Sequence, residues 1–219
     1  MKTGNVQSSH GVTLVGGGAP REDATRLLLS HAPYLVAADG GANACHSFGL
    51  SPKTVIGDFD SLDPKVRADA TNTEFIHIAE QDSTDFEKSL TRIEAPFILA
   101  TGFTSARLDH TLATLSALVR HSGPPVIVLG EDDILFAAPP ELSLDLVAGT
   151  RVSLFPMAPV QGRSTGLEWP IDGLHLAPDG RIGTSNCATG PVTLTFDAPG
   201  CLVILPPEAL PAALAALTD

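Results

Sequence analysis

The sequence predicts an N-terminal α/β domain with a mostly parallel sheet, followed by a small all-β domain. Short, continuous apolar runs recur along the first part of the chain, with helix-like stretches between them. Such runs are typical of parallel strands that are buried on both faces. After the proline-containing stretch from Ala137 to Glu141, short runs of alternating polar and apolar residues take over. Alternation of this kind indicates antiparallel strands with one buried face.

Strands of the first part are expected where apolar runs are bounded by Gly, Pro or Asp. The candidates are residues 13–16, 34–38, 54–56, 75–78, 96–100 and 126–129. Helices are expected between them. The clearest one contains Leu108, Leu112, Leu115 and Val119, whose spacing builds one apolar stripe. Strands that alternate with helices indicate an α/β domain.

The second part is expected to contain short strands and one closing helix. Residues 192–196 alternate as a strand does, and residues 207–217 form an Ala- and Leu-rich helix candidate. We therefore expect the first domain at residues 1–138 and the second at residues 139–219. A domain as small as the second is marginally stable alone, so we expect it to pack on the first domain or on a second subunit.

The charge of the chain limits its partners. The 219 residues carry a formal net charge of −12, and no cluster of Lys or Arg interrupts it. This charge repels nucleic acids and anionic membranes, so we expect neither as a partner. It also opposes the binding of ATP or another phosphate unless divalent cations bridge the charges. Clustered acids are therefore the first place to look for a site.

Cysteine usage and the N-terminus bear on the compartment. The three cysteines, Cys45, Cys187 and Cys201, are widely spaced and form no C-x-x-C pair, which suits a reducing compartment. Residues 1–11 lack the apolar region of a signal peptide, and no apolar run approaches the ~20 residues of a membrane helix. We expect a soluble, cytoplasmic protein.

Two of the predicted strands run directly into acidic turns that contain glycine. One leads into Asp39-Gly-Gly-Ala-Asn43, and the next leads into Gly57-Asp-Phe-Asp-Ser61. Ligands of parallel α/β sheets bind beyond the carboxyl ends of the strands. The glycines leave room for a ligand to approach the backbone. Both turns are therefore candidate parts of a binding site.

Asp58 and Asp60 are two residues apart. If the backbone is extended there, both carboxylates project to one side and Phe59 projects to the other. Such a pair could bind Mg²⁺, which takes one or two carboxylates together with phosphate oxygens and water. Alternatively, both acids are solvated turn residues before a helix with Asp63 as N-cap and Pro64 at its first position. Spacing alone leaves both interpretations open.

A second acidic pair opens a predicted helix. In Asp82-Ser-Thr-Asp85, Thr84 and Glu87 have the spacing of a capping box. Asp82 and Asp85 then flank a helix N-terminus, where backbone N–H groups can bind a phosphate and carboxylates can bind its metal. The alternative is that both acids only compensate the helix dipole.

The segment Arg107-Leu-Asp-His110 also lies between a predicted strand and a helix. Arg107 could neutralise phosphate charge, and Asp109 could orient it or accept a hydrogen bond from ribose or a metal-bound water. The two could equally pair on the surface, and we assign no catalytic role to His110. The glycine turn Gly16-Gly-Gly18 lacks the Walker lysine pattern and is weak evidence by itself.

The only tryptophan lies in the second part, in Ser164-Thr-Gly-Leu-Glu-Trp-Pro170, and Gly183-Thr-Ser-Asn186 follows. A Trp face suits a flat heteroaromatic or cationic ligand, and hydroxyl and amide side chains suit its polar edge. A lone Trp in a β domain is, however, more often part of the core.

At this point the sequence resembles the thiamine pyrophosphokinases (thiamine diphosphokinases). The resemblance runs from Val15 to about Asn186, and six short blocks occur in the order of that family. They are Asp39-Gly-Gly-Ala-Asn43, Gly57-Asp-Phe-Asp-Ser61, Asp82-Ser-Thr-Asp85, Arg107-Leu-Asp-His110, Ser164-Thr-Gly-Leu-Glu-Trp-Pro170 and Thr184-Ser-Asn186. The resemblance implies a first domain that binds Mg·ATP, a thiamine-binding β-sandwich as the second domain, and a homodimer whose interface forms the thiamine pockets.

The resemblance also implies a role for each matching residue. The metal-linked acids are Asp58, Asp60 and Asp85, which together with Arg107 are the catalytic residues. The nucleotide-side residues are Gln81, Asp82, Thr84, Arg107 and Asp109. The thiamine-side residues are Asp39, Trp169, Ser185 and Asn186. Ser105-Ala106 stand where the family usually has Gly-Gly.

The implied reaction is attack by the primary hydroxyl of thiamine on the β-phosphorus of ATP, which gives thiamine diphosphate and AMP. Mg²⁺ and Arg107 would neutralise charge on the phosphate oxygens. One alternative, a metal-dependent nucleotide hydrolase or other nucleotide phosphotransferase, would use the same acids without a thiamine pocket. A second alternative is a non-catalytic ligand-binding module in which the acids are helix caps.

Overall fold

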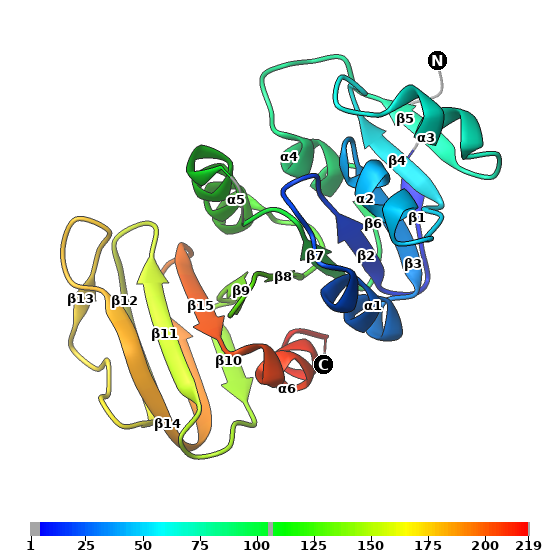
Figure 1. Ribbon diagram of the computed structural model, residues 1–219. Coiled ribbons are helices and arrows are strands. Elements are labelled where there is room, and N and C mark those ends of the chain that lie inside the picture. Colours follow the sequence, from blue (N-terminus) through cyan, green and yellow to red (C-terminus); the bar gives the residue numbers. More distant parts are fainter. Residues whose placement is uncertain (1–4, 105–106, 219) are drawn as a thin grey trace. The chain divides into compact units, whose positions relative to one another are not determined.

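The computed structural model describes residues 5–104 and 107–218, and the chain divides into two compact units (Figure 1). The first unit comprises the chain up to Ala117 together with His121–Gly130, and the second comprises Leu118–Arg120 and the chain from Glu131 onward. Ser105 and Ala106, which replace the glycine pair of the family pattern, lie outside the described residues.

The first unit alternates strands and helices, as the apolar runs predict. Its strands are β1 (Val6–Gln7), β2 (Val12–Val15), β3 (Tyr34–Ala38), β4 (Thr54–Gly57), β5 (Glu74–His77), β6 (Ile93–Glu94), β7 (Ile98–Thr101) and β8 (Val126–Leu129). Its helices are α1 (Glu22–His31), α2 (Gly41–Ser47), α3 (Pro64–Asp69), α4 (Asp85–Leu90) and α5 (Leu108–Arg120), whose last three residues belong to the second unit. The six predicted strands correspond to β2, β3, β4, β5, β7 and β8, and the predicted apolar-striped helix is α5.

The larger sheet of this unit has the strand order β8-β7-β2-β3-β4-β5, and all of these neighbours pair in parallel. Helices α1, α2 and α3 cover one face, and α4 and α5 cover the other (Figure 1). The chain moves outward from β2 to β5 and then returns to β7 on the opposite side of β2. A crevice is expected where the order reverses, at the carboxyl ends of β2 and β7.

Local sequence explains where α3 and α4, the helices that follow the acidic turns, begin. The Asp63 side chain accepts a hydrogen bond from the Lys65 N–H at 2.8 Å, with Pro64 as the first residue of α3. Thr84 caps α4, and the reciprocal Thr84–Glu87 capping box is complete. Both predicted caps are confirmed. They fix the directions in which α3 and α4 leave the acidic turns.

The second unit is built from antiparallel pairs. Its strands are β9 (Ile134–Ala137), β10 (Glu141–Leu144), β11 (Arg151–Pro156), β12 (Val160–Leu167), β13 (His175–Leu176), β14 (Gly183–Phe196) and β15 (Cys201–Leu205), followed by the 3-10 turn η1 (Pro207–Ala209) and α6 (Leu210–Thr218). The long strand β14 pairs with β11 near its start and with β10 and β12 near its end. The predicted run at residues 192–196 lies in β14, and the predicted closing helix corresponds to η1 and α6.

Over both units the pairing is mixed, and the description "mostly parallel" does not hold for the chain as a whole. The parallel pairs belong to the first unit. The strand pairs of the second unit, such as β11–β15 and β9–β15, are antiparallel. Strands β10 and β12 and the end of β14 alternate between buried and more exposed residues, as is typical of antiparallel strands with one buried face. Strands β9 and β15 are instead buried along most of their length.

Two of the cysteines are part of the core. Cys45 and Cys201 are buried, and burial raises the pKa of each thiol to about 12. These thiols therefore stay protonated and serve packing. Among the described helices, none is long and apolar enough to cross a membrane.

Candidate active site

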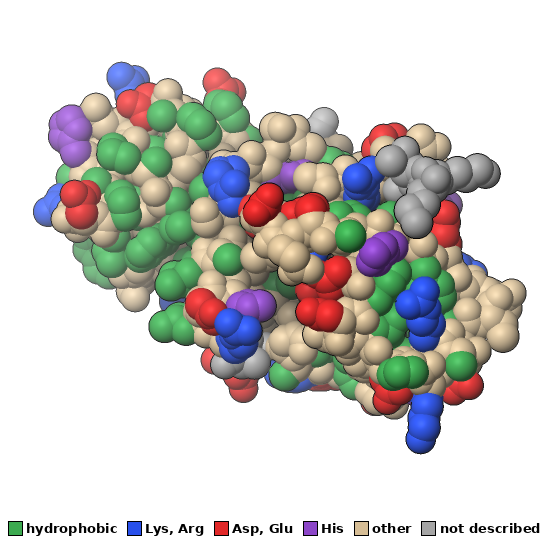
Figure 2. Space-filling view, turned by 90° about the horizontal axis from the view of Figure 1, so that it is seen from above, with side chains coloured by type: hydrophobic (Ala, Val, Ile, Leu, Met, Phe, Trp, Pro, Cys, Tyr) green, Lys and Arg blue, Asp and Glu red, His purple; other side chains and the backbone are tan. Residues whose placement is uncertain are grey.

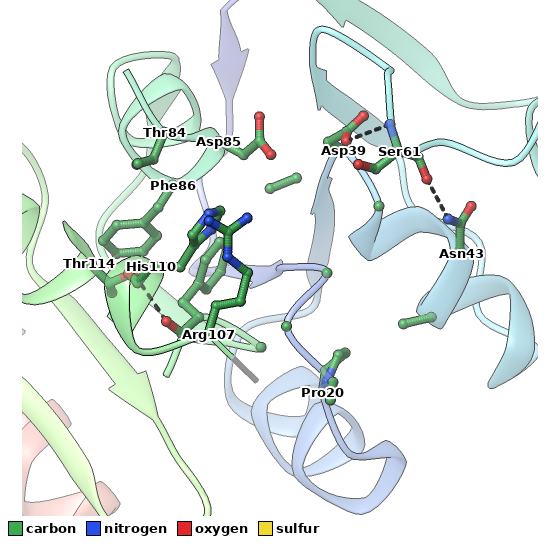
Figure 3. A pocket seen from close by; sticks show the side chains of 18 of the residues that line it. Pro20, Asp39, Asn43, Ser61, Thr84, Asp85, Phe86, Arg107, His110 and Thr114 are labelled. Atoms are coloured by element: carbon green, nitrogen blue, oxygen red, sulfur yellow. Dashed lines mark hydrogen bonds between the residues drawn. The ribbon is translucent and has the colours of Figure 1, made fainter. Parts of the chain in front are cut away.

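A cavity of about 640 Å³ opens at the crevice of the first unit. It is lined by the loops that follow β2 and β7, which contribute Gly17, Gly18, Gly102 and Phe103, and by the starts of α2 and α4. Figure 3 shows Asp85 and Arg107 on one side of this hollow and Asp39, Asn43 and Ser61 on the other. A cavity of this size suits a ligand as large as a nucleotide.

Three carboxylates gather at the ends of neighbouring strands. Asp39 follows β3, and Asp58 and Asp60 follow β4. One oxygen from each lies within 4.8 Å of the others, a set that could hold a metal ion. Figure 2 shows acidic side chains gathered on the face that is seen from above. The structure thus brings Asp58 and Asp60 together, as the spacing suggested, and adds Asp39 to them. We call these three carboxylates the acid cluster.

Asp39 is the most buried of these acids, with 1% of its surface exposed. Its Oδ2 accepts a hydrogen bond from the Ser61 N–H at 3.1 Å, but its buried Oδ1 has no hydrogen-bond partner among the described residues. Burial raises the pKa of Asp39, and the nearby charges of Asp60 and Asp58 add to the rise. An unpartnered buried carboxylate oxygen is costly without a cation. It is therefore the strongest structural indication of a ligand at this cluster.

The turn that carries Asp58 and Asp60 is not extended. Phe59 has a φ of +67°, a conformation that is rare for a bulky residue. Its ring packs against Phe75 and His77 with centroid distances of 5.7 and 5.4 Å. The Asp60 N–H donates to Asp58 Oδ1 at 3.3 Å. The two carboxylates converge because a tight turn anchored by the Phe59 ring directs them, and not because of strand alternation.

Lys88, which the sequence patterns did not single out, contacts two of the acids, Asp58 and Asp85. It belongs to α4, its side chain is only 3% exposed, and its Nζ lies 2.8 Å from Asp58 Oδ2 and 3.7 Å from Asp85 Oδ1. Burial disfavours the ammonium, yet the hydrogen bond to Asp58 and the charge of Asp85 raise the pKa of Lys88. The same hydrogen bond lowers the pKa of Asp58. The position of Lys88 three residues after Asp85 was the available signal.

The residues around the start of α4 have distinct surroundings. Asp85 is half-buried, and burial, followed by the charge of Asp39, raises its pKa. The Gln81 amide donates to Asp58 Oδ2 at 3.0 Å. The Asp82 side chain is exposed, and its backbone N–H donates to Glu80. Thr84 and Asp85 line the cavity, whereas Gln81 donates its hydrogen bond to Asp58 of the acid cluster.

Arg107 and Asp109 are exposed and pair with each other. This pairing agrees with the alternative in which Arg107 and Asp109 form an ion pair on the surface. Arg107 nevertheless lines the cavity, together with His110 and Thr114 of α5. Its guanidinium faces the hollow in Figure 3. Arg107 is thus available to a ligand in the cavity if it exchanges its exposed partner for a phosphate.

The thiamine-side candidates other than Asp39 lie together in the second unit. Trp169 is 57% exposed, so the interpretation of the lone tryptophan as a core residue is wrong. Its backbone is held by the buried Asn186, whose side chain accepts from the Trp169 N–H at 3.1 Å and donates to the Trp169 carbonyl at 2.6 Å. Neighbouring Ser185 has a φ of +61°. An exposed indole on a fixed backbone offers a flat surface to a ligand.

Parallel strands, a cavity at their reversal point and carboxylates around it are typical of α/β enzymes that act on phosphorylated ligands. Comparison with known proteins narrows this class. The family model described as thiamin pyrophosphokinase, catalytic domain, matches residues 25–128, and the model described as thiamin pyrophosphokinase, vitamin B1 binding domain, matches residues 141–201. The chain belongs to the thiamin pyrophosphokinase family.

Individual relatives agree with this assignment. The chain is 33% identical over 182 residues to thiamin pyrophosphokinase 1 of Caenorhabditis elegans, and the match covers 74% of each chain. It is 27% identical over 194 residues to thiamine pyrophosphokinase 1 of Oryza sativa, covering 73% of this chain and 74% of the relative. The structure of thiamin pyrophosphokinase from Candida albicans has the same fold, with a TM-score of 0.77, 16% identity and 94% of both chains covered.

Proposed function

We propose that this enzyme is a thiamine diphosphokinase, which transfers the diphosphate of ATP to the hydroxyl of thiamine. As a member of its family it is a diphosphotransferase. The observation that carries the proposal is the match of two successive family models, one catalytic and one vitamin B1 binding, to successive parts of one chain. A nucleotide hydrolase or another nucleotide phosphotransferase is not favoured, because neither needs a vitamin B1 binding domain.

We propose that Asp58, Asp60 and Asp85 bind Mg²⁺. Asp39, the remaining member of the acid cluster, would be a further ligand. The unpartnered, buried Asp39 Oδ1 supports a cation there. Carboxylate oxygens are the donors that Mg²⁺ prefers, with the remaining positions left to phosphate oxygens and water. Bound there, Mg²⁺ would neutralise charge that develops on the phosphates.

The cavity is proposed to bind ATP. Arg107 would neutralise phosphate charge, and Thr84 and Asp85 at the start of α4 would position the phosphates. Gln81, Asp82 and Asp109 are the other nucleotide-side candidates; Gln81 supports this role indirectly by fixing Asp58. The thiamine hydroxyl oxygen would form a bond to the β-phosphorus and release its proton to the solvent. The bond from that phosphorus to the oxygen bridging to the α-phosphorus would break, and AMP would leave with the electron pair of that bond on its phosphate oxygen.

The second unit is proposed to bind thiamine as a β-sandwich at residues 139–219, after a nucleotide-binding domain at residues 1–138. The division of β14 between two sets of partners supports a two-layered arrangement. Trp169, Ser185 and Asn186 would contact the thiamine rings. The resemblance gives Asp39 of the first unit a thiamine-side role as well, whereas its buried, unpartnered Oδ1 supports the cation role proposed above. A homodimer is part of this proposal, and the exposed Trp169, Leu108 and Leu112 support it. The cytoplasmic location stays a prediction.

Thiamine dependence tests the proposed function. Purified protein with thiamine, ATP and Mg²⁺ should form thiamine diphosphate, and EDTA in excess over Mg²⁺ should abolish the product. The measurement is chromatographic separation of thiamine from its phosphate esters. Steady ATP cleavage without thiamine, and no thiamine diphosphate with it, would instead identify a hydrolase.

Replacement of Trp169 tests the thiamine surface. We expect Trp169→Ala to raise the KM for thiamine about 5- to 100-fold and to change the KM for ATP less than about twofold, because an aromatic face stacked on a ligand contributes about 1–3 kcal/mol. Initial rates with each substrate varied in turn measure both constants.

Two control variants accompany Trp169→Ala. Trp169→Phe keeps a flat ring and should retain most of the affinity for thiamine. Val147→Ala alters a side chain of the same unit that is 79% exposed and should change neither constant. An unchanged KM for thiamine in Trp169→Ala would exclude the indole from the thiamine site.

A further inference from the structure

Lys88 brings a positive charge into the acid cluster from inside the protein. Its side chain is 3% exposed, and its Nζ contacts carboxylates from two different elements, Asp58 after β4 and Asp85 at the start of α4. A lysine this buried is rare unless it is paired. The acidic turn, Gly57-Asp-Phe-Asp-Ser61, contains no Lys or Arg. The positive charge next to Asp58 therefore comes from α4.

The hydrogen bonds of Asp58 are divided between its two oxygens. Oδ2 accepts from Lys88 Nζ at 2.8 Å and from Gln81 Nε2 at 3.0 Å. Oδ1 accepts only one bond among those the structure records, a 3.3 Å contact from the Asp60 N–H. Oδ2 is thus occupied from the protein side, and Oδ1 keeps accepting capacity for a ligand. The pairing therefore leaves Oδ1 as the oxygen of Asp58 with more capacity for a further ligand.

We propose that Lys88 is a positioning residue that acts as a built-in counter-ion: its ammonium holds Asp58 and Asp85 in place before a divalent cation binds. The inference rests on the cation site of the proposed function. Oxygens of Asp39, Asp58 and Asp60 lie within 4.8 Å of one another, and Lys88 Nζ lies 2.8 Å from Asp58 Oδ2 and 3.7 Å from Asp85 Oδ1. Without Lys88, the cation-free protein would have to keep Asp58 and Asp85 close together with no positive charge between them.

This role predicts that Lys88 stabilises the cation-free form of the protein more than the cation-bound form. Lys88 stabilises the cation-free form, because it is then the positive charge closest to Asp58 and Asp85. When a divalent cation is bound, the acids have a second partner, and loss of Lys88 matters less for stability. A lysine that served packing alone would contribute equally to both forms.

The test is the melting temperature, Tm, of Lys88→Met measured at pH 7.5 with EDTA and with saturating Mg²⁺ and no nucleotide. Met keeps the length of the side chain and removes its charge. In EDTA we expect the Tm to fall by roughly 6 °C or more relative to the parent, as for a broken buried ion pair in a protein of this size. Mg²⁺ should then raise the Tm of Lys88→Met by at least twice the rise that it gives the parent.

The control is Lys65→Met, which alters an exposed lysine of α3 and should behave like the parent in both buffers. If Lys88→Met does not fold in EDTA, Lys88→Gln provides the same comparison with a polar group retained. An equal loss of Tm with and without Mg²⁺ would overturn the counter-ion role while leaving the cation site intact. No Mg²⁺ effect on the Tm of the parent would overturn the cation site, and the role of Lys88 with it.

Discussion

Asp58→Asn should lower kcat/KM about 10²–10³-fold, because it removes a carboxylate charge from the proposed cation site and from its pair with Lys88. Asn has nearly the same shape as Asp, and its amide oxygen can still accept from the Lys88 ammonium. We therefore expect the variant to remain folded. Initial rates of thiamine diphosphate formation over a range of Mg²⁺ concentrations measure the effect, with circular dichroism as the check of the fold.

Asp63→Asn is the matched control for Asp58→Asn. Asp63 lies in the same loop and caps α3, and Asn is an equally good N-cap. This control should retain nearly full activity. If Asp58→Asn keeps full activity at both limiting and saturating Mg²⁺, Asp58 is not a metal ligand.

Gly41→Ala should lower the free energy of unfolding by about 3 kcal/mol, because the structure has no space for a methyl group there. A Cβ at Gly41 would lie 2.0 Å from the Val15 carbonyl oxygen and 2.7 Å from the Val15 carbonyl carbon. Both are backbone atoms at the end of β2, so α2 or β2 must shift. Because the loop after β2 lines the cavity, we also expect the KM for ATP to rise. Urea unfolding measures the stability.

Gly17→Ala provides the comparison. A Cβ at Gly17 meets its nearest neighbour, in Gly40, at 3.4 Å, which is an ordinary contact. Its unfolding free energy should stay within about 1 kcal/mol of the parent value. Equal stability of Gly41→Ala and Gly17→Ala would mean that α2 does not pack on the end of β2 as described.

Much of the first unit could be predicted from the sequence because its strands are continuous apolar runs. The four residues of β2, Val12–Val15, are all buried, and so are those of β7 and β8. The caps of α3 and α4 were equally clear, because the side chain and the backbone N–H that it binds are close in the sequence. The short strands β1 and β6 were not predicted, since pairs of two residues leave no periodic signal.

The site was only partly predictable, since its contacts join residues far apart in the chain. Strand ends indicated the acidic turns, but the approach of Lys88 to Asp58 depends on how α4 packs on β4. The glycines after Asp39 suggested room for a ligand, whereas the space at Gly41 is filled by β2. The exposure of Trp169 depends on tertiary packing that composition does not encode.

The turn at Phe59 shows how an expected result can have a different cause. Alternation along an extended strand would direct Asp58 and Asp60 to one side. The observed turn does so with Phe59 at a positive φ, and its ring is held by Phe75 and His77 and lies 5.0 Å from the Arg67 guanidinium carbon. Such a backbone persists only where the surroundings over-determine it.

The most direct test of diphosphate transfer is the identity of the nucleotide product. ATP, thiamine and Mg²⁺ are incubated with the enzyme, and AMP, ADP and the thiamine phosphates are separated and quantified. Transfer of a diphosphate predicts AMP and thiamine diphosphate in equal amounts, with no thiamine monophosphate. Release of ADP together with thiamine monophosphate would mean that a single phosphoryl group is transferred, and would contradict the proposed reaction.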